Sequence, residues 1–325
     1  FASGMAALIY QLAWARMLSL TFGSTTLATA GVIAGVLGGM GIGAWLYHLI
    51  FDRIGKPLLI YCVLEWGIAL SAGVLTRVFY SLPENYTALF SQAGSLPDIV
   101  DLAAIFFLLL IPAALMGATF PALCTVMIHS TQNIDRRLGL IYGVNTLGAA
   151  FGAFLAGIFF IEHFGLTPSV TIGNAVTILV GLSAFALLGR WAQADSRKKT
   201  VVQPAALKTS LPRRLTGTLL LLSGFTTMAY EIVWFRALRY FVGNTTYALS
   251  TVLVIFLVGL GLGSLLLRRV LRYGSPERAL ALVQLGIGTL AMLAMAAEWV
   301  FLAVPELRNQ VSIFSEIAGD RPWWG

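Results

Sequence analysis

The chain is poor in charged residues, histidines and cysteines. Only 11% of its 325 residues are Asp, Glu, Lys or Arg, and it contains two cysteines and three histidines. Cys62 and Cys124 lie in separate apolar runs without a histidine or second cysteine at metal-ligand spacing, and the histidines are scattered. The sequence therefore predicts inert buried thiols, no metal or haem site, and no bound cofactor.

The elements of a nucleotide-dependent enzyme are also missing. No segment reads as a strand followed by a Gly-rich loop and a helix, and Gly39, Gly41 and Gly43 lie inside an apolar run with no strand before them. This context excludes a dinucleotide fingerprint. We predict no catalytic residue within these 325 residues.

Apolar residues are abundant instead. They make up 58% of the chain, with a mean hydropathy of +0.85, which is more than one soluble core can bury. A membrane-spanning helix needs about 20 mostly apolar residues. Nine such runs predict an integral membrane protein with nine helices, near residues 2–22, 26–47, 57–80, 100–128, 138–161, 168–190, 214–240, 246–268 and 277–303.

The net charge of +7 is explained by where the basic residues lie, without nucleic acid as a partner. The connections at 82–99, 162–167 and 241–245 contain no Lys or Arg. Basic loops stay in the cytoplasm, so the N-terminus is predicted to be cytoplasmic. Fifteen of the 21 basic residues fall in the alternate connections: Arg53, Lys56, Arg136, Arg137, Arg190, Arg197, Lys198, Lys199, Lys208, Arg213, Arg214, Arg268, Arg269, Arg272 and Arg278.

A long stretch of the chain occurs twice. Residues 3–46 match residues 223–266 without a gap, with sixteen identities in forty-four positions. With one residue dropped, the match continues so that Glu65 aligns with Gln284. A repeat of several spans indicates duplicated membrane halves that run in the same direction. The identical positions include Gly4, Tyr10, Trp14, Arg16, Gly39, Gly41 and Gly43 in the first copy and Gly224, Tyr230, Trp234, Arg236, Gly259, Gly261 and Gly263 in the second.

The repeat divides the chain into three parts. Residues 1–190 form a first six-helix half, residues 191–212 form a polar cytoplasmic linker, and residues 213–325 form the first three helices and outer loop of a second half. In the first half, Gly31, Gly35, Gly39 and Gly43 recur every four residues, which predicts one helix face in close contact with a neighbour.

Polar residues within the spans supply the candidate binding site. An ionisable group at the centre of a span costs about 2.5–3.5 kcal/mol on insertion scales, so it needs a partner or a water-filled cavity. Glu65 and Glu231 meet this description, and aromatic residues near the duplicated arginines suit a small cation. The predicted substrate-binding residues are Tyr10, Gln11, Trp14, Arg16, Glu65, Asn145, Tyr230, Glu231, Trp234 and Arg236.

Simpler roles exist for the same residues. Arg16 and Arg236 lie nearer the outer ends of their helices, where long side chains reach the membrane surface. Asn145 lies among glycines and suits helix packing. A structural ion pair would use the same charges, and we expect a contact between Arg16 and Glu231 across the halves.

Three segments resemble the membrane portion of bacterial fused major facilitator/spermidine synthase-like proteins: residues 4–16 (GMAALIYQLAWAR), 115–121 (LMGATFP) and 139–149 (GLIYGVNTLGA). The resemblance covers nearly the whole chain. It implies an all-α polytopic protein of the bacterial inner membrane, with a major-facilitator-like parallel repeat of six-helix halves whose second half is truncated after its third helix. In that family an aminopropyltransferase-like catalytic domain commonly follows. These residues do not contain one, so enzymatic activity is left open.

The first functional hypothesis is a transporter-like domain that handles a small cationic metabolite such as a polyamine. The second is a non-transporting scaffold that anchors a spermidine synthase-like domain or joins other membrane subunits. A third is a membrane-anchored enzyme whose chemistry lies beyond Gly325. In each case the lipid bilayer is the first partner.

Overall fold

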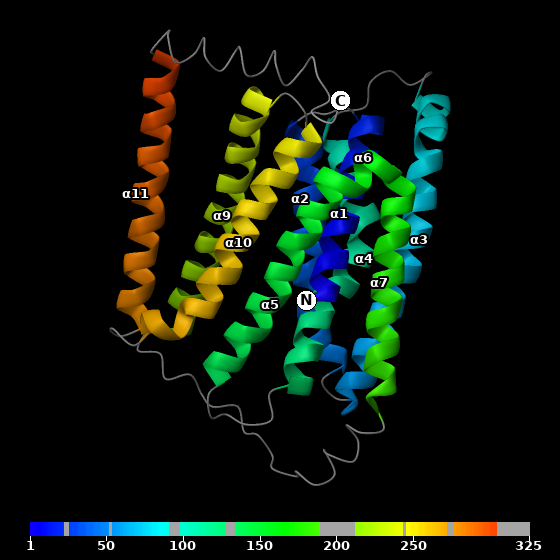
Figure 1. Cartoon of the computed structure of the whole chain (residues 1–325), viewed down its shortest axis with the longest axis horizontal. Helices are drawn as coiled ribbons and strands as arrows, with labels where there is room; N and C mark the ends of the chain where they lie inside the picture. The colour runs from blue at the N-terminus through cyan, green and yellow to red at the C-terminus, as the bar shows by residue number, and fades with distance from the viewer. Residues whose placement is uncertain are drawn as a thin grey trace.

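The computed structural model describes residues 1–22, 26–51, 54–90, 98–127, 134–188, 212–242, 245–271 and 276–303. Within these ranges all regular structure is helical, and the long helices stand side by side as an upright bundle (Figure 1). The helices of 21 residues or more are α1 (Ala2–Phe22), α2 (Thr26–Leu46), α3 (Pro57–Phe90), α4 (Asp98–Met127), α5 (Ile134–Leu155), α7 (Leu166–Ala186), α9 (Arg213–Val242), α10 (Thr245–Leu271) and α11 (Pro276–Ala303).

Each of the nine apolar runs corresponds to one of these helices. Two boundaries differ from the prediction by more than four residues. The helix α3 continues to Phe90 rather than ending near residue 80, although Pro83 lies within this extension. The predicted run 138–161 is divided, since α5 is followed by the π-helical turn η2 (Ala156–Phe160) and the short α6 (Ile161–Phe164).

Among the described residues, eight helical segments are long and apolar enough to cross a membrane, and α1 is not among them. Gln11 and Arg16 lower the hydropathy of α1. This helix needs less apolar surface because it packs against α3, α5 and α7, and Tyr10 and Trp14 are buried there. The chain is therefore a multi-pass membrane protein by the length and composition of its helices.

The predicted glycine face of α2 packs on α4. A Cβ atom added to Gly39 would meet Ala113, and one added to Gly43 would overlap the carbonyl oxygen of Ala114. On the facing helix, a Cβ atom added to Gly117 would overlap the carbonyl oxygen of Met40. The small residues thus let the two backbones touch, as in other closely packed membrane helices.

Three hydrogen bonds join α10 to the α5–α6 segment, and we call this interface the α5–α10 seam. Ser250 Oγ donates to the Ala153 carbonyl at 2.7 Å, and Ser264 Oγ donates to the Gly139 carbonyl at 3.2 Å. The Tyr247 hydroxyl donates to Glu162 Oε2 at 2.7 Å. Because these contacts lie along most of the length of α10, they fix that helix against the first part of the chain.

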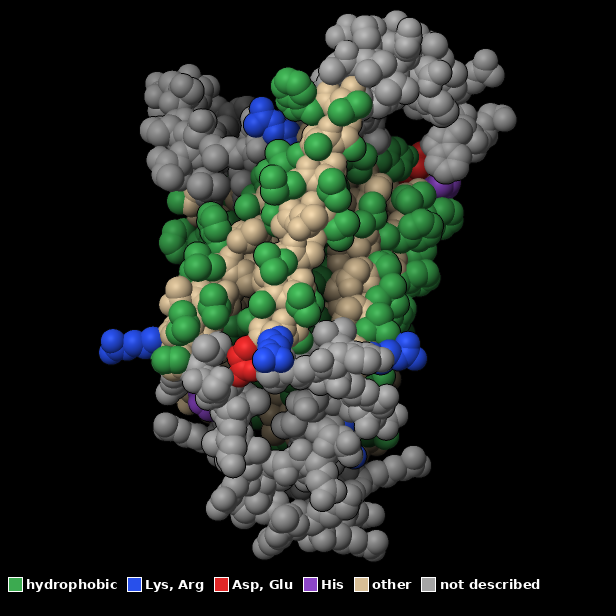
Figure 2. All heavy atoms as spheres, turned by 90° about the vertical axis from the view of Figure 1, so that its left-hand side faces the viewer, with side chains coloured by type: hydrophobic (Ala, Val, Ile, Leu, Met, Phe, Trp, Pro, Cys, Tyr) green, Lys and Arg blue, Asp and Glu red, His purple; other side chains and the backbone are tan. Residues whose placement is uncertain are grey.

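The helix α11 stands at the edge of the bundle (Figure 1), and no residue of its apolar segment Glu277–Ala297 is buried. Figure 2 shows the face of the bundle on which α11 stands. Hydrophobic side chains cover the middle of this face, and Lys and Arg side chains lie mainly along its lower edge. An apolar band bounded by basic residues is typical of a surface that faces lipid. The predicted linker 191–212 lies outside the described residues except at Pro212.

Candidate functional site

The centre of the bundle contains an aromatic pair on α1. The rings of Tyr10 and Trp14 are stacked, with centroids 5.4 Å apart and planes inclined by 13°. The Tyr10 hydroxyl donates to Asn174 Oδ1 at 2.8 Å and lies 3.1 Å from Thr177 Oγ1, while Trp14 Nε1 donates to Thr76 Oγ1 at 3.4 Å. Polar contacts with α3 and α7 therefore hold both predicted aromatic residues in place.

Glu65 lies next to this pair and is only 1% exposed. It is about 12 Å along α3 from Pro57, at 1.5 Å per residue, and so lies well inside the span. Ser3 Oγ donates to Glu65 Oε1 at 2.6 Å, and the Tyr61 hydroxyl is a second hydrogen-bond partner. Both hydrogen-bond partners are neutral, and the positive charge that acts on Glu65 is the amino group of Phe1 rather than a Lys or Arg side chain.

A cavity of about 50 Å³ brings together three of the predicted site residues, Tyr10, Glu65 and Asn145. We call it the inner cavity. The described residues that line it include no Lys or Arg, and Glu65 is their only carboxylate. Its lining is completed by Ser3, Gly4, Ala7, Met40, Ile68, Met116, Thr119, Phe120 and Thr177.

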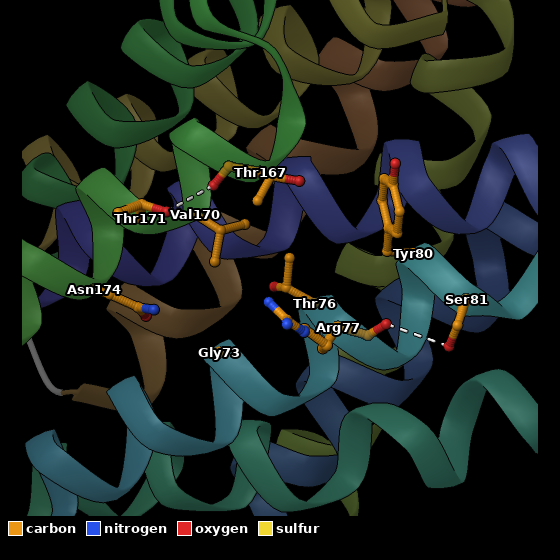
Figure 3. Close-up of a pocket in the computed structure, with 9 residues that line it drawn as sticks. All are labelled: Gly73, Thr76, Arg77, Tyr80, Ser81, Thr167, Val170, Thr171 and Asn174. Carbon is orange, nitrogen blue, oxygen red and sulfur yellow. Dashed lines mark hydrogen bonds between the residues drawn. The ribbon is translucent and has the colours of Figure 1, made fainter.

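A larger pocket of about 650 Å³ lies between α3 and α7 (Figure 3), and we call it the outer pocket. Asn174 lines the outer pocket and Thr177 lines the inner cavity, and both contact the Tyr10 hydroxyl. Tyr10 therefore separates the two spaces. The outer pocket is lined by Gly73, Thr76, Arg77, Tyr80, Ser81, Thr167, Val170, Thr171 and Asn174.

The predicted site residues of the second copy do not form a comparable cluster. Glu231 is buried, Tyr230 and Trp234 are partly buried, and Arg236 is exposed. None of them lines the inner cavity or the outer pocket. Among the described residues Glu231 has no hydrogen bond or ion pair, so the expected contact with Arg16 is not formed in this conformation.

The two remaining predicted residues lie on α1. Gln11 is buried, and Arg16 is partly buried and has an interaction partner. Neither lines the inner cavity. Tyr10, Trp14 and Glu65 thus form a compact group, with Asn145 at the cavity wall. The other predicted residues lie apart from this group.

The Ser3–Glu65 contact has an equivalent in the second copy. Gln284 Nε2 donates to Ser223 Oγ at 2.7 Å. Ser223 aligns with Ser3, and Gln284 aligns with Glu65. The same pair of positions therefore joins α1 to α3 and α9 to α11, with a charged acceptor in one copy and a neutral amide in the other.

Four residues that contact the Tyr10, Trp14 and Glu65 side chains were not among the predicted site residues: Ser3, Thr76, Asn174 and Thr177. A signal for Ser3 was available, because serine occupies this position in both copies. Asn174 and Thr177 are three residues apart on α7 and therefore share a face. The sequence alone does not say that this face meets Tyr10.

A segment of the chain is similar to a known protein. The similar segment is 24% identical over 176 residues, which is 54% of this chain. The known protein is polyamine aminopropyltransferase 1 of Streptomyces coelicolor. The match covers 30% of that protein, so the chain corresponds to less than a third of its length. No known family profile and no solved structure matches the chain.

Proposed function

We propose that this chain is a transporter-like domain that binds a small organic cation, such as a polyamine, at Glu65 in the bacterial inner membrane. The observation that supports the proposal is the carboxyl group of Glu65 on a cavity inside the bundle. It has hydroxyl partners and no Lys or Arg among the described lining residues. Glu65 is therefore the one side chain among the described lining residues that can supply a full charge, and that charge is negative.

Electrostatics favours a cationic ligand here. A carboxylate buried without a partner charge is costly, and a bound ammonium group offsets that cost. The Tyr10 ring lines the same cavity, and Trp14 stacks against it. An ammonium group near an aromatic face gains about 0.5–2 kcal/mol from the cation–π interaction. The carboxylate and the aromatic residues therefore favour the same class of ligand.

The size of the inner cavity indicates that a ligand needs another conformation. A space of about 50 Å³ holds a few water molecules at most, whereas small-molecule sites usually measure about 300–1,000 Å³. In this conformation a Cβ atom added to Gly4 would overlap the carbonyl oxygen of Asn145. We infer that α1 moves relative to α3 and α5 when the ligand enters, as in a transporter whose halves rock about a central site.

The experiment is polyamine uptake into proteoliposomes with Glu65→Gln. The substitution removes the charge and leaves a side chain that accepts the Ser3 hydrogen bond. Glu162→Gln is the matched control, because Glu162 is an exposed carboxylate that lines neither space, and the glutamine amide oxygen can still accept the Tyr247 hydrogen bond of the α5–α10 seam. We expect uptake of labelled spermidine to fall at least tenfold in Glu65→Gln and to stay near the wild-type level in Glu162→Gln. Wild-type uptake no faster than in protein-free vesicles, or equal uptake by both variants, would contradict the proposal.

A second candidate function is a membrane anchor for an aminopropyltransferase-like domain. The specific observation in its favour is that the similar protein is named an aminopropyltransferase and that the match covers only 30% of it. The test is an assay of aminopropyl transfer by the intact protein purified from its native membrane, with peptide mapping beyond Gly325. If the chain is only an anchor, Glu65→Gln leaves this transfer unchanged and no variant affects uptake.

A further inference from the structure

The outer pocket carries a charge opposite to that of the inner cavity. Among the described residues that line it, Arg77 is the only charged one, and none is a carboxylate. The guanidinium group extends into the space between α3 and α7 (Figure 3). Arg77 is exposed and has no hydrogen bond or ion pair from its side chain to another described residue. The pocket therefore presents an unneutralised positive charge.

Asn174 adds a second donor to the pocket. Its Oδ1 accepts the hydrogen bond from Tyr10, which leaves its Nδ2 group available. This nitrogen faces α3, because a Cβ atom added to Gly73 would lie 3.6 Å from it. The absence of a side chain at Gly73 keeps the space in front of the amide open. The Tyr10 contact therefore fixes Asn174 with its donor toward the pocket.

Hydroxyl groups of the lining divide into two classes. Those of Thr76, Ser81 and Thr171 donate to carbonyl groups of their own helices. The hydroxyl groups of Thr167 and Tyr80 have no hydrogen-bond partner among the described residues. Together with Arg77 and Asn174, they give the pocket four side chains that can donate to a ligand.

The start of α7 reinforces this polarity. Gly165 precedes the helix with φ +86°, and Thr167 in the first helical turn lines the pocket. Backbone N–H groups in the first turn have no intrahelical acceptor, and the helix dipole is positive at this end. Arginine and the N-terminal end of a helix both favour an anion.

We propose that the outer pocket binds a molecule through an anionic phosphate group, with Arg77 as its main contact and Asn174 as a second donor. The volume of about 650 Å³ is in the range of small-molecule sites. The pocket lies at the C-terminal end of the apolar segment Pro57–Ser81 and at the N-terminal end of Leu166–Ala186. That depth is reached both by soluble phosphate compounds and by the headgroups of anionic lipids. The proposal does not depend on Glu65.

The experiment compares Arg77→Gln with Arg214→Gln in the full chain purified in detergent. Arg214 is an exposed arginine on α9 that lies outside the pocket and controls for the loss of one positive charge. One arm measures labelled inorganic phosphate by equilibrium dialysis. The other measures retention of dioleoylphosphatidylglycerol against dioleoylphosphatidylcholine in mixed micelles by native mass spectrometry. Thermal unfolding and gel filtration establish that each variant is folded.

We expect Arg77→Gln to weaken binding at least tenfold and Arg214→Gln to change it less than twofold. Arg77→Lys keeps the charge, so it should bind better than Arg77→Gln but less well than the wild type. Loss in the phosphate arm identifies a soluble ligand, and loss in the phosphatidylglycerol arm alone identifies a lipid headgroup. The proposal is overturned if the wild type shows no saturable binding in either arm or if Arg77→Gln binds as well as Arg214→Gln.

Because Arg77→Gln also alters the exposed end of α3, Asn174→Leu provides an independent test. This substitution removes the second donor on the opposite helix and leaves the charge of Arg77 intact. We expect a three- to tenfold loss in the same arm that Arg77→Gln affects. Unchanged binding in Asn174→Leu would exclude the second donor, and a loss confined to the other arm would overturn the assignment of a single shared site.

Discussion

Residues 3–46, which contain most of α1 and α2, and residues 223–266, which contain most of α9 and α10, are identical at sixteen of forty-four positions, yet the surroundings of the two helix pairs differ. In the first pair, Gly39 and Gly43 lie against α4, and Tyr10 is completely buried. In the second pair, a Cβ atom added to Gly259 or Gly263 would have no neighbour within 4 Å in the described structure.

This difference shows that the glycine pattern does not specify which face of the helix meets a neighbour. A Cβ atom added to Gly261 would meet Leu147, whereas one added to the equivalent Gly41 would have no neighbour within 4 Å among the described residues. The equivalent contacts within each copy follow the sequence, since Ser3 meets Glu65 and Ser223 meets Gln284. The contacts that differ depend on neighbours outside the shared segments, such as α4 and α7. Two segments whose sequences match closely can therefore differ in structure, so that one encloses a site and the other leaves the equivalent surface open.

The largest effect is expected at the glycines. Gly43→Ala forces the backbones of α2 and α4 apart, because the new methyl group would overlap the carbonyl of Ala114. We expect the free energy of unfolding to fall by about 3 kcal/mol, in the upper part of the range for overpacked sites. Gly263→Ala is the matched control and should lose nothing. Unfolding by titration with denaturing detergent measures both, and equal losses would show that α10 has a close neighbour at Gly263.

A smaller effect is expected at the paired serines. Ser3→Ala removes a hydrogen bond to a carboxyl group that is 1% exposed, and we expect a loss of about 2 kcal/mol in the free energy of unfolding. Ser223→Ala removes the equivalent bond to a partly exposed amide, and about 0.6 kcal/mol is typical of such bonds between membrane helices. The same detergent titration compares them. A larger loss in Ser223→Ala would reverse the distinction between the copies.

The smallest effect is expected at the paired tyrosines. Tyr10→Phe removes the hydroxyl that contacts Asn174 and Thr177, with an expected cost of about 1 kcal/mol. Tyr230 has no hydrogen bond to another described residue, so Tyr230→Phe should be neutral. Thermal unfolding of the two variants in one detergent tests this, and indistinguishable midpoints would show that the hydroxyl of Tyr10 contributes nothing.

The sequence predicted the helices well, because a span needs a long apolar run and its ends coincide with polar connections. It also identified Glu65 as a cavity residue, since an ionisable group in such a run needs polar surroundings. It did not identify the neighbours Asn174 and Thr177, because helical periodicity describes a face of one helix and not the helix it meets. The expected contact between Arg16 and Glu231 is not formed in this conformation, because the sequence pattern likewise does not say which helices meet. The assignment of the ten residues to substrate binding stays a prediction.

The α5–α10 seam has a consequence for how the bundle can move. Its hydrogen bonds occur near Gly139, Ala153 and Glu162, so sliding α10 along α5 would break all three, whereas turning α10 about the line of contact would strain them far less. The seam would then act as a hinge axis. Rotation about it would move α9 away from α1 and its neighbours and would widen the space beside α1, while the hydrogen bonds of the seam stay formed.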